Sequence, residues 1–224
     1  MKNRFLTIFT IFAIATSIVS CKDKAQEANT SEAEAATVSE STSVKYSVNT
    51  SESSIAWKGF KPTGTHNGTV NIESGVFATE KGQLQSGTFL IDMKSIVSND
   101  MEEGEYKTKL ENHLKGTVEG KEGDFFNVTK FPTGAFEITG SEAMEGGKTK
   151  LSGNLALKGQ KHNVSFPVMI TIEGDMITIA SEAFTIDRTK WDINYGSKSV
   201  FDNLGDKFIN DDMELQITVK AKKK

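Results

Sequence analysis

A strict alternation of apolar and polar residues over positions 151–179 constrains the fold of this chain more than any other feature. Bulky apolar side chains occupy one parity of positions 151–157 and again of positions 164–172. A period of two is typical of β-strands that bury one face and leave the other in water. Gly159-Gln160 and Gly174-Asp175 separate the runs, and Gly-X pairs suit two-residue hairpin turns. The stretch therefore predicts an antiparallel meander with one apolar face.

These two turns also fix which residues face each other across the meander. The first turn would place Leu155 opposite Val164. The second would place Ile172 opposite Ile177. In both hairpins the turn and the apolar pattern put the same side chains on one face, so two independent signals agree.

The alternation slips by one position after Ile179. Bulky side chains then occupy the opposite parity at Phe184 and Ile186, with Arg188 in phase with them. One extra residue near 181–183 would restore the apolar face, which is what a β-bulge does. Bulges bend strands and help a sheet to close. The apolar face must be buried, either against a second sheet or by closure of the sheet on itself.

Weaker signals place the other elements. Asn67-Gly68 is a strong hairpin-turn signal, and the polar run over 101–114 predicts one short helix. Alternating apolar residues predict further strands at 44–48, 55–58, 70–72, 84–96, 136–138 and 213–219. About eight or nine strands with one helical insertion fit a single all-β domain over residues 44–224.

Residues 1–20 have the features of a secretory signal peptide. Lys2 and Arg4 precede an apolar run over 5–19, and a small residue, Ser20, follows it. The mature protein is therefore expected to be exported. Lys and Arg number 26 against 30 Asp and Glu, so the charge balance does not indicate a nucleic-acid partner.

Cys21 is the only cysteine, so an internal disulfide is excluded. Its position after the apolar run resembles a bacterial lipobox, in which the cysteine carries the acyl anchor; an ordinary cleaved signal with a chance cysteine is the alternative. Residues 21–43 are interpreted as this lipidated N-terminus and a disordered tether, because they are almost free of apolar side chains. Lys22, where an Asp would favour inner-membrane retention, favours anchoring in the outer membrane.

Several short motifs together resemble those of the YceI-like family of secreted proteins, over residues 44–220. They are SIAWKG at 54–59, GTHNGTV at 64–70, GTFLIDM at 87–93, HLK at 113–115, DFF at 124–126, FPT at 131–133, GNLALKG at 153–159 and FTIDRT at 184–189. The resemblance implies a lipocalin-like, antiparallel up-and-down β-barrel of about eight strands that often forms a homodimer. It also implies a long polyisoprenoid ligand, of the quinone or prenyl phosphate type, held in the barrel interior.

Two interpretations of the inward-facing apolar side chains stay open. They line a cavity for an isoprenoid lipid in an envelope lipid-binding protein, or they fill the core of a non-catalytic envelope scaffold protein. The family resemblance favours the cavity. The predicted lining set is Trp57, Phe89, Ile91, Phe136, Ile138, Leu155, Leu157, Val164, Phe166, Phe184 and Ile186.

Arg188 is the only arginine outside the signal peptide, and the bulge would turn it toward the apolar face. A buried guanidinium needs a partner, because an unpaired buried charge is costly. One interpretation is an ion pair with a distant carboxylate, such as Asp92, Asp124 or Asp192. The other is a contact with the polar head group of the ligand at the barrel mouth.

No catalytic or metal site is predicted. His66, His113 and His162 lie in separate segments without the close spacing of metal-ligand pairs. A Gly-x-Ser-x-Gly nucleophile elbow is absent from the sequence. The chain is therefore expected to be a binding protein rather than an enzyme, with no cofactor besides the lipid.

Overall fold

The computed structural model describes residues 25–224, and it confirms an all-β fold with one short helix. The elements are β1 (Gln26–Glu27), β2 (Asn29–Glu32), β3 (Val44–Val48), β4 (Ser54–Lys61), β5 (Gly64–Glu80), β6 (Gln83–Ser98), α1 (Glu105–Lys115), β7 (Thr133–Ala143), β8 (Lys148–Leu157), β9 (Gln160–Glu173), β10 (Met176–Ser181), β11 (Phe184–Asp187) and β12 (Asp212–Lys223).

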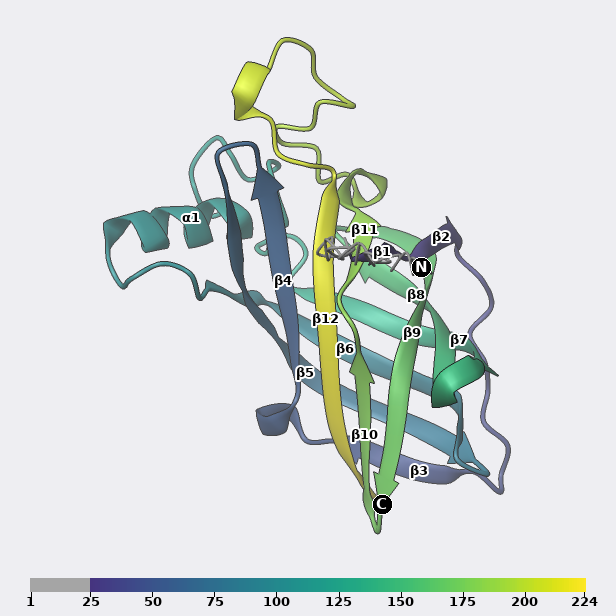
Figure 1. The fold of residues 1–224 in the computed structure, drawn as a ribbon. Coiled ribbons are helices and arrows are strands. Elements are labelled where there is room, and N and C mark those ends of the chain that lie inside the picture. Colours follow the sequence, from purple (N-terminus) through teal and green to yellow (C-terminus); the bar gives the residue numbers. More distant parts are fainter. Residues whose placement is uncertain (1–24) are drawn as a thin grey trace, which may run out of the picture.

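Eight antiparallel strands close into a ring (Figure 1). Following hydrogen-bonded neighbours, the ring runs β4, β5, β6, β7, β8, β9, β10 and β12, and β12 returns to β4. β11 continues β10 along one edge of β12, and β3 pairs with both β5 and β12. The predicted eight-stranded barrel-like architecture is therefore confirmed.

The predicted meander is present, with one register corrected. Ile172 faces Ile177, as the second turn predicted. The first turn lies one residue earlier than predicted, at Lys158-Gly159, where both residues have positive φ. Leu155 consequently faces His162 and not Val164. The pairing moves by two residues, so every side chain keeps its face, and the apolar pattern could not reveal the error.

The predicted bulge lies between β10 and β11. Ala180 pairs with Thr218 and Phe184 pairs with Leu215, so four steps along one strand match three along β12. Phe184 is buried as a result. The extra residue restores the apolar face where the sequence predicted it.

The predicted turn at Asn67-Gly68 is wrong, because both residues lie inside β5. The turn between β4 and β5 is at Pro62-Thr63, where Lys61 pairs with Gly64. Gly68 serves close packing instead: a Cβ there would lie 1.8 Å from the carbonyl oxygen of Val97.

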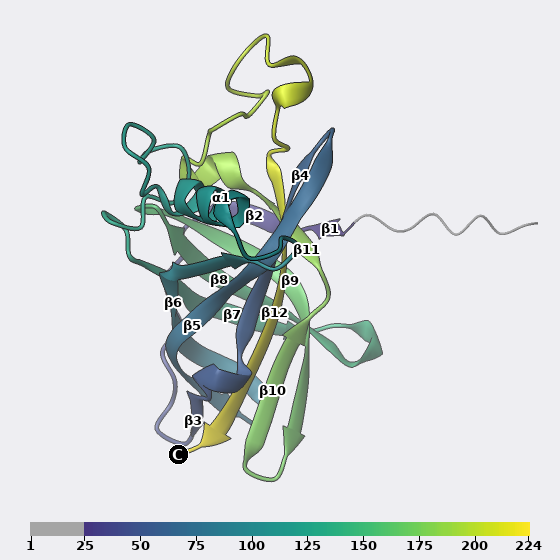
Figure 2. The ribbon, with the colours of Figure 1, turned by 90° about the vertical axis from the view of Figure 1, so that its left-hand side faces the viewer.

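Helix α1 begins at Glu105, later than the predicted 101, and ends at Lys115. Gly116 caps it in the left-handed conformation typical of helix C-termini. Figures 1 and 2 show α1 and the long connection before β12 at the same end of the ring, with the C-terminus at the opposite end. These two insertions surround one mouth of the ring. In the described part of the chain, no helix is long and apolar enough to cross a membrane.

Residues 26–32, within the segment predicted as a disordered tether, form two short strands. β1 pairs in parallel with β11, and β2 pairs antiparallel with β9. Asn154 of β8 then holds the backbone of Glu34 twice: its Oδ1 accepts from the amide at 2.9 Å and its Nδ2 donates to the carbonyl at 2.6 Å. Strand addition relies on backbone hydrogen bonds, which composition does not reveal. The predicted signal peptide and Cys21 lie outside the described residues.

Candidate ligand-binding site

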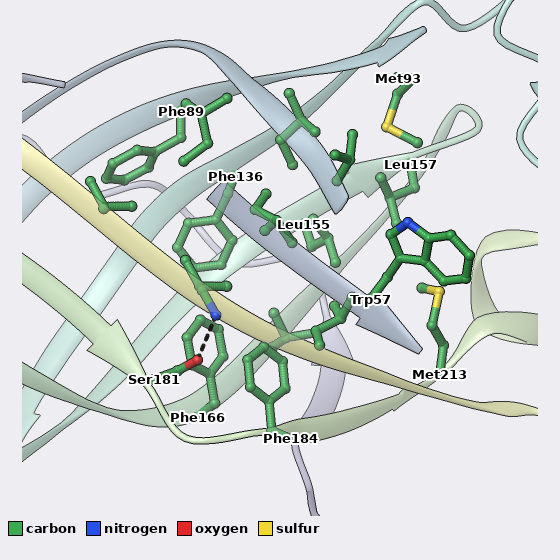
Figure 3. Close-up of a pocket in the computed structure, with 18 of the residues that line it drawn as sticks. Trp57, Phe89, Met93, Phe136, Leu155, Leu157, Phe166, Ser181, Phe184 and Met213 are labelled. Atoms are coloured by element: carbon green, nitrogen blue, oxygen red, sulfur yellow. Dashed lines mark hydrogen bonds between the residues drawn. The ribbon is translucent and has the colours of Figure 1, made fainter. Parts of the chain in front are cut away.

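The ring encloses an apolar cavity of about 110 Å³. All eight ring strands contribute to its lining. Apart from the indole of Trp57, Ser181 is the only polar side chain in the lining among residues 25–224. Its hydroxyl accepts a hydrogen bond from the amide of Ile217 at 2.9 Å (Figure 3). An apolar, uncharged interior of this kind suits a slender apolar ligand.

All but two of the predicted lining residues face this cavity. Ile138 and Ile186 are fully buried but lie outside the lining. The predicted residues in the lining are Trp57, Phe89, Ile91, Phe136, Leu155, Leu157, Val164, Phe166 and Phe184.

The structure also adds lining residues that the prediction omitted. Some share the strand alternation and could have been found from it, such as Ile72 and Ile217. Leu114 of α1 and Phe126 of the following loop carry no strand signal, yet both close the mouth end of the cavity. Their position depends on how α1 packs on the ring, which local sequence does not specify.

A row of aromatic rings crosses the wall of the cavity. Phe89 lies 6.3 Å from Phe136, which lies 5.9 Å from Phe166, and Phe166 stacks on Phe184 at 4.2 Å between centroids. Gly153 makes room for this row, since a Cβ there would lie 2.2 Å from the ring of Phe136. Cross-strand aromatic contacts of this kind stabilise a sheet beyond their buried area.

A second cavity of about 190 Å³, which we call the mouth cavity, adjoins the first. Trp57, Leu114, Phe126 and Met213 line both cavities, so these side chains form the boundary between them. The mouth cavity is more polar than the ring cavity, because its lining includes Lys61, His66, His113, Arg188, Asn210 and Asp212. Apolar and polar compartments in contact match the two ends of an amphiphile.

Two of the three histidines are bound to carboxylates at this mouth. His66 Nδ1 lies 2.9 Å from Asp100 Oδ2, and His113 Nε2 lies 2.7 Å from Asp124 Oδ2. His162 instead packs edge-on against Trp191. The three histidines therefore do not converge, and no group of three potential metal ligands occurs among residues 25–224.

The Asp100 carboxylate is stabilised in its charged form. Burial raises its pKa, but hydrogen bonds from the Asn67 amide, from His66 and from the Ser98 hydroxyl outweigh burial and leave the pKa below its ordinary value. Through its hydrogen bonds to Asn67 and Ser98, Asp100 connects β5 with the end of β6 beside the mouth.

Arg188 is buried in a short 3₁₀ turn, Arg188–Trp191. Its guanidinium donates hydrogen bonds to backbone carbonyl groups. It donates to the carbonyl oxygens of Asn210 at 3.0 Å, Tyr195 at 3.0 Å and Ile209 at 3.1 Å, and also to that of Ile193. These bonds fix both ends of the connection before β12.

The nearest carboxylate to Arg188 is Asp211, with 3.8 Å between Nη2 and Oδ1. None of the three predicted carboxylate partners, Asp92, Asp124 and Asp192, forms this pair. Burial lowers the pKa of Arg188, while Asp211 and Asp187 act in the opposite direction. This geometry supports a structural role over the predicted head-group contact, because four backbone carbonyls already occupy the guanidinium.

Residues 46–221 match the family model of the YceI-like domain. The chain belongs to the YceI-like family. Among solved structures, BcnA from Burkholderia cenocepacia is 16% identical to this chain, with a TM-score of 0.57. The match covers 77% of this chain and 98% of that chain. A polyisoprenoid binding domain from Saccharophagus degradans is 10% identical to this chain, also with a TM-score of 0.57. That match covers 81% of this chain and 99% of the other. No curated protein matches this sequence.

Proposed function

We propose that this YceI-like protein is a non-catalytic lipid-binding protein that holds a long isoprenoid chain inside the ring. The observation that carries the proposal is the apolar cavity, which all eight ring strands line and which opens toward a polar mouth. The structural likeness to a polyisoprenoid binding domain supports the same ligand class. A scaffold protein with a filled core has no need of such a cavity.

The test is organic extraction of the purified protein followed by mass spectrometry of the extract. We expect an isoprenoid lipid in a constant ratio to protein. A matched sample of Phe136→Trp, which would fill the cavity with a larger ring, should yield less lipid. Protein that carries no lipid, and takes none up from vesicles, would support the filled-core scaffold instead.

We also propose that the protein is exported and anchored in the outer membrane through acyl chains on Cys21. The lipobox-like sequence before Cys21 and the signal-peptide features of residues 1–20 support this location. Replacing Cys21 by Ser should release the protein from the membrane fraction or leave it uncleaved. A Cys21→Ser protein that is processed and stays membrane-bound contradicts the anchor. A homodimer stays a prediction from the family resemblance.

A further inference from the structure

The wall of the ring has a break between β9 and β11, and the N-terminal segment crosses it. β2 pairs with β9 as far as Ser165, whereas β10 pairs with β9 from Val168 onward. On the other side of the break, β1 pairs with β11. The chain changes from one edge to the other at Ala28, which is buried and donates its amide to the carbonyl oxygen of Thr185 at 2.8 Å (Figure 1). Residues 26–32 therefore close a wall that the ring strands leave incomplete.

Behind this segment the wall is one side chain thick. Phe184 lines the ring cavity, and it also lines a groove of about 640 Å³ on the outside of the ring. Among residues 25–224 it is the only one that lines both. Its ring stacks on that of Phe166 (Figure 3). On the inside, two stacked side chains close the break in place of a strand.

Of the two N-terminal strands, β1 is held less firmly. It makes two residue pairs with β11, whereas β2 makes four with β9. Asn154 additionally binds the backbone of Glu34, directly after β2. Segments with few contacts and exposed hydrogen bonds open first in a folded protein. We therefore expect β1 to leave β11 while β2 stays on β9.

The mouth of the ring is closed by parts that are fixed more firmly than β1. Leu114 and Phe126 close the mouth end of the ring cavity. The connection before β12 is held there by the buried guanidinium of Arg188, which donates to several backbone carbonyl groups. Local opening is consequently expected at the break before it is expected at the mouth.

The proposed acyl anchor at Cys21 keeps the break close to the bilayer. Cys21 precedes Gln26, the first residue of β1, by five positions. Five residues span at most about 18 Å when fully extended. Because Gln26 also lines the outer groove, this side of the ring stays within reach of the membrane.

We propose that β1 is a side gate of the ring. When β1 leaves β11, Phe184 turns aside, and an isoprenoid chain passes directly between the lipid bilayer and the ring cavity. The bilayer is thus the partner of the side of the ring that carries the outer groove. This inference rests on the proposed lipid-binding function and adds the route by which the ligand enters.

The test measures the rate at which squalene, an isoprenoid hydrocarbon, moves from phosphatidylcholine vesicles to the protein. The parent protein is the mature chain with Cys21→Ser, which keeps all described residues and has no native thiol. Glu27→Cys with Thr185→Cys places cysteines on paired residues of β1 and β11. Neighbouring strands lie about 4.8 Å apart, within the Cα range of a disulfide. Asn29→Cys with Ser165→Cys is the matched control, because its disulfide fixes β2 on β9 and leaves β1 free.

Oxidation of the cysteine pair between β1 and β11 should slow the uptake of squalene at least about 10-fold. Reduction of the same sample should restore the rate of the parent protein, which also shows that the variant is folded. Oxidation of the control pair should leave the rate unchanged. The amount of squalene bound at equilibrium should be the same in every case, because a gate changes rates and not affinity.

Ala28→Pro tests the gate in the opposite direction. It removes the amide that bonds Thr185, so β1 should open more often and uptake should become about 3- to 10-fold faster, the effect of one hydrogen bond. Ala36→Pro is the control, because Ala36 is exposed beyond β2 in the same segment. Its uptake rate should equal that of the parent protein.

Two outcomes overturn the gate and leave the lipid-binding function intact. They are uptake at the parent rate when the pair between β1 and β11 is oxidised, and an unchanged rate in Ala28→Pro. Either result makes the mouth the route of entry. Failure of the parent protein to take up squalene overturns the lipid-binding function itself, and the gate with it.

Discussion

The ring of Phe166 stacks on that of Phe184, with 4.2 Å between centroids and 7° between planes, across a break in strand pairing. β10 pairs with β9 only as far as Ser181 and Val168. Beyond that point β2 occupies the edge of β9 and β1 occupies the edge of β11. The break is therefore bridged inside the ring by Phe166 and Phe184, and the two free strand edges pair with β1 and β2.

Replacing Phe166 by Ala should destabilise the protein by an amount that depends on bound lipid. A fully packed Phe contributes about 3–5 kcal/mol to the free energy of unfolding. Phe166 faces the cavity, so the loss should be smaller in lipid-free protein, where fewer atoms touch the ring, and larger with lipid bound. Urea unfolding of both forms measures it.

Phe77→Ala is the control for this prediction, because Phe77 is equally buried and does not line the ring cavity. Its loss of stability should be the same with and without lipid. Equal losses for Phe166→Ala in the two forms would indicate a filled core.

Replacing Asn154 by Ala should release the N-terminal segment while the ring stays folded. The side chain makes both hydrogen bonds to the backbone of Glu34, and it is buried. Hydrogen exchange at the amides of Glu34 and Thr37 should become faster, with protection in β8 and β9 retained. Ser152→Ala is the control, because the Ser152 hydroxyl is paired with that of Ser165 across the β8–β9 hairpin. Unchanged exchange at Glu34 contradicts this role for Asn154.

The strand pattern alone predicts much of the ring and its lining. The alternation over 151–179 specifies the faces of β8 to β10, and the slip after Ile179 locates the bulge. It does not specify the first hairpin register, because a two-residue shift leaves the same side chains inward. The segment over 26–32 escapes detection for a different reason: it adds to free strand edges through its backbone, so its polar side chains carry no signal.

The mouth of the site is the part that the sequence does not predict. Arg188 is correctly predicted to be inward, but its partners are carbonyl groups of a connection without regular structure. The boundary side chains Leu114 and Phe126 come from the helical insertion, whose position over the ring depends on tertiary packing. Trp57 is predicted as lining, whereas its position at the boundary of the two cavities emerges only from the three-dimensional arrangement.

The stability contributed by Asp100 should depend on pH in the acid range. Its pKa is lower in the folded protein than the ordinary value of about 3.9, so its contribution is present above that value. The contribution is lost as the pH falls through the folded-state pKa, since protonation removes the charged acceptor. Asp100→Asn should therefore destabilise the protein at pH 7 and have a smaller effect at about pH 3.

Urea unfolding at the two pH values measures this difference for Asp100. Asp175→Asn serves as the control, because Asp175 is exposed in the second meander turn. Its effect should be small at both pH values. A loss for Asp100→Asn that is equally large at pH 3 contradicts the assignment.

Replacing Arg188 by Gln should destabilise the whole domain and disorder the connection before β12. Four carbonyl groups would lose a charged donor, and hydrogen bonds to charged groups contribute about 1.5–3 kcal/mol each, so a loss of at least about 3 kcal/mol is expected. Lys190→Gln, an exposed change in the same turn, should have little effect. Urea unfolding and lipid content measured on the same samples separate the two roles of Arg188. A variant that keeps wild-type stability and loses only its lipid would restore the head-group interpretation.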